Sequence, residues 1–252
     1  MPFIKYNEVL PHAAVITLNC PETRNLMTPG LIEELDKYLS LINQNPEIKV
    51  VVINGAGKSF SMGFDLPGFI DKFHSDNIGS DKEEKLYELI IKLQNIFLKI
   101  SHSPAVFIAS MQRHVFGAGL DLASWCDIRI GAKNSKYCIA ETDLGIVADL
   151  GSLNNLPYII GESNTRYLAL TGSVLSGESA FAMGLLNQIT ENENLEKDTM
   201  NLVNKLLNKP GNILKSLKSS LNHLMTVPHA QGLEFLAKLN SKELLRSGIL
   251  KE

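Results

Sequence analysis

The sequence predicts an α/β fold, and three stretches in its first quarter indicate this. Residues 13–18, Ala-Ala-Val-Ile-Thr-Leu, form the apolar run of a buried strand. Thr28 and Pro29 then mark the start of a helix, because threonine caps helices well and proline is tolerated in a first turn. Leucine and isoleucine recur at helical spacing as far as Ile42, and residues 50–53 supply a second buried strand. This strand–helix–strand order is typical of an α/β core.

The predicted secondary structure changes at about residue 162, from mixed strands and helices to helices. Before it, we expect a helix over 82–100, a strand over 105–109, a helix over 118–125 and a strand over 127–130. Residues 67–82 look like a mobile polar connection instead. After residue 162 the pattern is almost wholly helical, with helices expected over 195–207, 212–224 and 230–245. Because short helices with apolar faces commonly pack on a neighbouring subunit, we expect an oligomer.

Composition narrows the classes of partner and compartment. The net charge of −3 gives no reason to expect nucleic acid or a membrane surface as a partner, and no apolar run is long enough to span a bilayer. Cys20, Cys126 and Cys138 are odd in number and unclustered, so we expect reduced thiols and no metal site. The first residues lack the apolar core of a signal peptide. We therefore expect a cytoplasmic protein.

Three carboxylates stand in unusually apolar, glycine-rich surroundings. Asp121 lies between two leucines, Asp149 lies between an alanine and a leucine, and Glu141 precedes the second of these stretches. Desolvation raises a carboxyl pKa toward the range where the group both takes and gives protons. The trio therefore indicates proton-transfer chemistry. The structural alternatives are that Asp121 stabilises the start of a helix and that Asp149 is a turn residue.

Two glycine-containing turns, 60–65 and 116–121, each follow a buried strand. Glycine lets the backbone turn sharply, and the N–H groups that such a turn frees can converge on an oxyanion. The alternative for each is a tight strand-to-helix turn that binds nothing.

Taken together, these two turns resemble the motifs of the crotonase (enoyl-CoA hydratase/isomerase) superfamily. The residues that carry the likeness are 57–66, Gly-Lys-Ser-Phe-Ser-Met-Gly-Phe-Asp-Leu, and 117–129, which begin Gly-Ala-Gly-Leu-Asp. Residues 19–27 and 171–186 are similar to the superfamily's earlier and later signatures. The resemblance implies a spiral of β-β-α units over 1–190 and a helical region over 191–252 that builds homotrimers or homohexamers. It also implies an acyl-CoA thioester as substrate, with coenzyme A carried by the substrate and no separate cofactor.

The same resemblance implies roles for individual residues. The backbone N–H groups of Phe64 and Ala118 match the superfamily's oxyanion hole. Hydratases of the superfamily have glutamate at the positions of Asp121 and Glu141. The order Asp121, Glu141, Asp149 is instead similar to that of Δ3,5-Δ2,4-dienoyl-CoA isomerases. The isomerases' chemistry implies that Glu141 removes a proton at C2, Asp149 delivers one at C6, and Asp121 orients or tunes Glu141.

Three positions depart from the superfamily's pattern and leave other functions open. Arg113 stands where glycine is usual, Ala118 replaces the middle of three glycines, and Met62 replaces a small residue. The resemblance favours an isomerase that converts 3,5-dienoyl-CoA into 2,4-dienoyl-CoA in fatty-acid degradation. The alternatives are an enoyl-CoA hydratase and a catalytically silent module that binds acyl-CoA.

Overall fold

The computed structural model describes residues 1–76 and 82–247. Its main sheet has six strands in the order β1 (Ile4–Leu10), β2 (Ala13–Leu18), β3 (Val50–Gly55), β4 (Val106–Met111), β6 (Ile128–Ala132), β9 (Gln188–Thr190). The first pair is antiparallel and every later pair is parallel. A second sheet has the order β5 (His114–Phe116), β7 (Lys136–Cys138), β8 (Leu175–Ser176).

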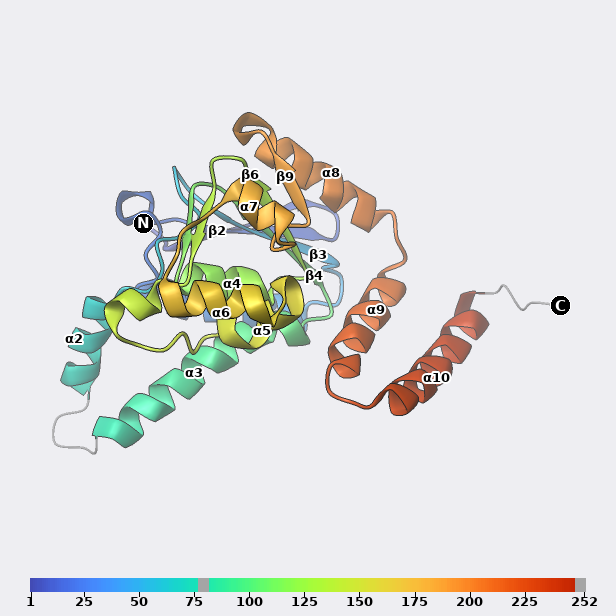
Figure 1. Ribbon diagram of the computed structural model, residues 1–252. Coiled ribbons are helices and arrows are strands. Elements are labelled where there is room, and N and C mark those ends of the chain that lie inside the picture. Colours follow the sequence, from blue (N-terminus) through green and yellow to red (C-terminus); the bar gives the residue numbers. More distant parts are fainter. Residues whose placement is uncertain (77–81, 248–252) are drawn as a thin grey trace.

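Helices cover both faces of the main sheet (Figure 1). In chain order they are α1 (Pro29–Gln44), α2 (Leu66–Asp76), α3 (Lys82–His102), α4 (Ala118–Trp125), α5 (Ser152–Ile160), α6 (Glu162–Thr171), α7 (Gly177–Ala182), α8 (Leu195–Leu207), α9 (Gly211–Leu224) and α10 (His229–Ser247). Short 3₁₀ turns occur at Pro21–Thr23, Glu141–Leu144 and Asn192–Asn194. No helix of the described residues is both long and apolar enough to cross a membrane.

The alternation of side chains along the strands divides the core in two. In β3, Val51 and Ile53 face the larger core with α1, α3 and α4, whereas Val50 and Val52 face a smaller core with Val203 of α8. Successive strand residues point to opposite faces, so an unbroken apolar strand is buried on both sides. This explains why the run at 50–53 has no polar alternation.

The sequence-based expectations for the first elements are confirmed. Strand β2 covers 13–18, and α1 begins at Pro29 with the Thr28 side chain accepting a hydrogen bond from Leu31 N–H. The carboxyl-terminal helices also lie within one or two residues of the expected bounds. The antiparallel edge strand β1 was not predicted.

The predicted mobile connection over 67–82 is wrong for its first part. Residues Leu66–Asp76 form α2, and α3 starts at Lys82; residues 77–81 lie outside the described part of the chain. Pro67 and Gly68 favour a loop in a sequence reading, but both lie in the first turn, where proline is tolerated. Phe69, Ile70 and Phe73 then follow at helical spacing and face an apolar cavity.

A buried lysine attaches α9 to the body of the molecule. The Lys218 ammonium group donates hydrogen bonds to the carbonyl oxygens of Ile100 (2.7 Å) and Ala105 (2.8 Å) and pairs with Asp127 at 2.8 Å. The compensation of a buried charge by several partners is what makes its burial tolerable. Beyond this point α9 and α10 extend to one side of the sheet (Figure 1).

Candidate active site

The two glycine turns of the sequence lie against each other. Ser61 N–H donates to the carbonyl of His114 (3.0 Å), and Phe116 N–H donates to the carbonyl of Ser61 (3.1 Å). Gly63 has φ +101°, and a Cβ added there would lie 2.9 Å from the Phe116 carbonyl oxygen and 3.6 Å from Ala118 N. A side chain at Gly63 would therefore separate the turns, so glycine is required for their close approach.

Free backbone donors remain at this junction. Ala118 is the first residue of α4, so its N–H precedes the helical hydrogen-bond ladder. Within residues 1–76 and 82–247, neither Phe64 N–H nor Ala118 N–H donates a hydrogen bond to the protein. Both residues line one cavity. The structure thus brings together the two amides predicted to form an oxyanion hole.

The cavity has a volume of about 630 Å³ and is mostly apolar. The helices α2 and α3 supply much of its wall through Phe69, Ile70, Phe73, Leu86, Leu89, Ile90 and Leu93. The three predicted acids, Asp121, Glu141 and Asp149, also line it. A large apolar pocket with a few polar groups is typical of a small-molecule site. The sequence reading missed the α2 wall because it assigned those residues to a connection.

Asp121 is buried, with 1% of its surface exposed, and its Oδ1 atom binds the start of α5. Ser152 N–H donates to Oδ1 at 2.6 Å, and the Ser152 hydroxyl donates to the same atom. A carboxylate at this place satisfies a free helix N–H group and complements the helix dipole. Asp121 therefore binds the start of α5, and it also lies in the first turn of its own helix, α4, as the structural alternative held.

The segment that carries Asp149 is held from both sides. The Gln94 side-chain amide of α3 donates to the Asp149 carbonyl oxygen (2.8 Å), and the Trp125 indole N–H of α4 donates to the Leu150 carbonyl oxygen (2.7 Å). Gly151 has φ +142°, and a Cβ there would approach Trp125 Nε1 to 2.2 Å. Sequence reasoning had no signal for these partners, since they lie far away along the chain.

Glu141 lies at the start of a 3₁₀ turn and packs against the Gly117 turn. A Cβ at Gly117, where φ is +49°, would lie 3.0 Å from Glu141 Oε1. The other carboxyl oxygen, Oε2, is buried and has no hydrogen-bond partner among the described residues. A buried acceptor without a partner is costly, so this oxygen is suited to receive a proton.

Burial raises the pKa of all three acids. Desolvation is the largest cause in each, and it raises the pKa of Asp121 to about 7 even though the Ser152 hydrogen bonds favour the charged form. The charges of Glu141 and Asp149 raise the Asp121 pKa further. Asp149 raises the pKa of Glu141 in the same way. Asp149 is exposed toward the open cavity, but desolvation against the apolar wall still raises its pKa.

Comparison with known proteins assigns the family. The model of the enoyl-CoA hydratase/isomerase family matches residues 11–247. This chain belongs to that family. It is 31% identical to the peroxisomal Δ3,5-Δ2,4-dienoyl-CoA isomerase of Arabidopsis thaliana over 91% of this chain and 84% of the relative. It is 28% identical to the human mitochondrial enzyme of the same name over 95% of this chain and 74% of the relative.

Solved structures of the enoyl-CoA hydratase/isomerase family share the fold. A protein of Thermobifida fusca, solved in complex with acetoacetyl-CoA, is 26% identical with a TM-score of 0.87, over 97% of this chain and 96% of that one. The crotonase-like fold expected from the sequence motifs is thereby confirmed, as is the family. The family and the relatives support an activity as an acyl-CoA isomerase or hydratase.

The raised pKa of Asp121 predicts a pH-dependent stability. Its pKa is higher in the folded state than in the unfolded chain, so the folded state binds the proton more tightly between about pH 4 and pH 7. The free energy of unfolding should fall as the pH rises through this window, by at most about 4 kcal/mol. Asp121→Asn, which keeps an acceptor for Ser152, should flatten the dependence. Urea unfolding at pH 4.5 and pH 8 measures both, and an equal pH slope in the two proteins would contradict the assignment.

Proposed function

We propose that this protein isomerises 3,5-dienoyl-CoA thioesters to 2,4-dienoyl-CoA thioesters in fatty-acid degradation. The observation that carries the proposal is that Glu141 and Asp149, eight residues apart on the connection between β7 and α5, line the same apolar cavity as Phe64 and Ala118 with their free amides. Moving two conjugated double bonds toward the thioester needs proton removal at C2 and delivery at C6. Two acid–base groups at separate places meet that need better than one.

Each residue has a distinct part in the proposed reaction. The Glu141 carboxylate takes the C2 proton, and the electron pair spreads over the diene to the thioester oxygen. The Phe64 and Ala118 N–H groups bind the negative charge on that oxygen. Asp149, whose pKa is raised by desolvation, gives its proton to C6 and becomes ionised. Transfer of the proton from Glu141 back to Asp149 restores the starting state.

Asp121 acts in this proposal as a positioning residue. The sequence suggested that it orients Glu141, but its hydrogen bonds are to Ser152, three residues after Asp149. Asp121 thus supports the Asp149 segment at one end, while the charges of Glu141 and Asp149 raise the pKa of Asp121 itself. The hydratase alternative needs two carboxylates around one water, and Asp149 has no role in it.

The substrate assay separates the isomerase from its alternatives. With 3,5-octadienoyl-CoA, we expect ultraviolet absorbance to rise as the conjugated 2,4-dienoyl thioester forms, and we expect little hydration of crotonyl-CoA. Asp149→Asn should abolish isomerisation and leave the Kd for the thioester nearly unchanged, because the amide keeps the size of the side chain. Asp143→Asn is the matched control, since Asp143 is exposed on the adjacent 3₁₀ turn and does not line the cavity.

The outcomes of this assay have different consequences. Dominant hydration of crotonyl-CoA would assign the chain to the hydratases. Tight thioester binding without turnover would support the silent module. Full activity of Asp149→Asn would remove Asp149 from the mechanism.

The oxyanion role of Ala118 can be tested by removing one N–H group. Proline is tolerated at the first residue of a helix, so Ala118→Pro deletes this donor with little cost to α4. We expect kcat/KM to fall about 10²–10³-fold. Ala118→Gly retains the N–H and restores the residue usual in the superfamily, so its activity should stay near that of the native protein. Equal losses in both variants would contradict the assignment to the backbone amide.

We also propose that the chain forms a homotrimer or homohexamer. The helices α9 and α10 carry exposed apolar side chains that one chain leaves uncovered, including Leu217, Leu221, Leu233 and Leu245. Leu217 and Leu221 are four residues apart on α9 and so share one face of it, and an exposed apolar face commonly marks an interface. Light scattering of the purified protein should give a mass of three or six chains, and a monomer would contradict the proposal. The cytoplasmic location stays a prediction from sequence.

A further inference from the structure

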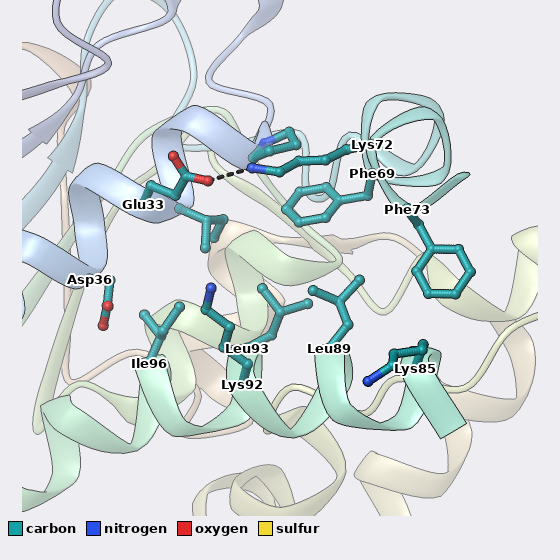
Figure 2. A pocket seen from close by; sticks show the side chains of 12 residues that line it. Glu33, Asp36, Phe69, Lys72, Phe73, Lys85, Leu89, Lys92, Leu93 and Ile96 are labelled. Carbon is teal, nitrogen blue, oxygen red and sulfur yellow. Dashed lines mark hydrogen bonds and ion pairs between the residues drawn. The ribbon is translucent and has the colours of Figure 1, made fainter. Parts of the chain in front are cut away.

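Two cavities adjoin each other across the side chains of α2 and α3. The first is the cavity of the candidate active site, and the second, of about 230 Å³, lies among α1, α2 and α3 (Figure 2). Phe69, Phe73, Leu89 and Leu93 line both. These four side chains are therefore the wall between the two spaces.

Phe69 occupies the part of this wall nearest the reacting end of the site. Its ring stacks on that of Phe64 with centroids 3.9 Å apart and 23° between the planes, and only 7% of the residue is exposed. In Figure 2 the ring extends from α2 toward Leu89 and Leu93 of α3. An acyl chain that starts at the Phe64 amide and follows the apolar wall would meet this ring.

The second cavity has an apolar wall and five charged residues in its lining, Glu33, Asp36, Lys72, Lys85 and Lys92. Ile32 and Ile96 add to the shared apolar wall. Glu33 pairs with Lys72 at 2.5 Å, Asp36 pairs with Lys99, and Lys85 pairs with Glu88 at 2.7 Å (Figure 2 draws the first pair). Exposed pairs of this kind offer little net attraction to an added ion. The apolar side of this space, formed by Ile32, Ile96 and the shared wall, is the part that suits an aliphatic chain end.

We propose that Phe69 is the residue that sets acyl chain length, and that the cavity behind it is a chamber for the distal methyl end of a longer aliphatic chain. This inference rests on the proposed function, because it takes the first cavity as the acyl site. The aromatic ring ends that site in the native protein. Removal of the ring joins the two cavities, and each further methylene that is then buried favours binding about fourfold.

The test compares a short and a long substrate in matched variants. The measured quantity is kcat/KM for 3,5-hexadecadienoyl-CoA divided by that for 3,5-octadienoyl-CoA. We expect Phe69→Ala to raise this ratio at least tenfold, the effect of about two more buried methylenes. Ile70→Ala is the control, since Ile70 is the next residue of α2 and lines the first cavity only. It should change the ratio less than about twofold.

A second variant and a binding measurement keep the two proposals separable. Phe69→Leu retains an apolar helix former and should raise the ratio in the same direction if Phe69→Ala does not fold. If no variant isomerises octadienoyl-CoA, the proposed function fails, and calorimetric binding of palmitoyl-CoA against octanoyl-CoA still measures the chain-length ratio. An unchanged ratio in both Phe69 variants, or an equal rise in Ile70→Ala, would overturn the assignment of Phe69.

Discussion

The buried carboxylate of Asp121 is the constraint on which the site depends. It projects from α4, the helix that begins at the Ala118 amide, and its Oδ1 atom binds the first residue of α5. One carboxyl group thus joins the turn that carries the free Ala118 N–H to the segment that carries Asp149. Burial of a carboxylate is costly unless hydrogen bonds compensate for it, and Ser152 supplies two. Any change in Asp121 is transmitted to both halves of the site.

The apolar cavity explains why the carboxyl groups that line it have raised pKa values. Desolvation by burial raises the pKa values of Glu141 and Asp149 above those of ordinary surface acids. The apolar wall of the same cavity suits the aliphatic chain of the proposed substrate. The Phe69 ring separates this cavity from the second one, and it does so next to Phe64.

Much of the fold could be predicted because local patterns agreed with the tertiary structure. The Thr28 cap, the Pro29 first turn and the strand at 13–18 all depend on near neighbours, and each was found where expected. Helix α2 was not predicted, because Pro67 and Gly68 favour a loop in isolation. What stabilises this helix is packing, since Phe69 stacks on Phe64 of the preceding turn and faces α3. Tertiary contacts can override local propensity in this way.

The sequence by itself determined the three acids, their order, and the glycines that allow two sharp turns. These follow from residue type and backbone sterics, which need no knowledge of distant neighbours. Only the tertiary structure decided that the turns lie against each other, that the acids line one cavity, and that Asp121 binds Ser152 instead of Glu141. The reason is physical: burial and hydrogen-bond partners depend on segments brought together by the sheet, and no local pattern encodes them.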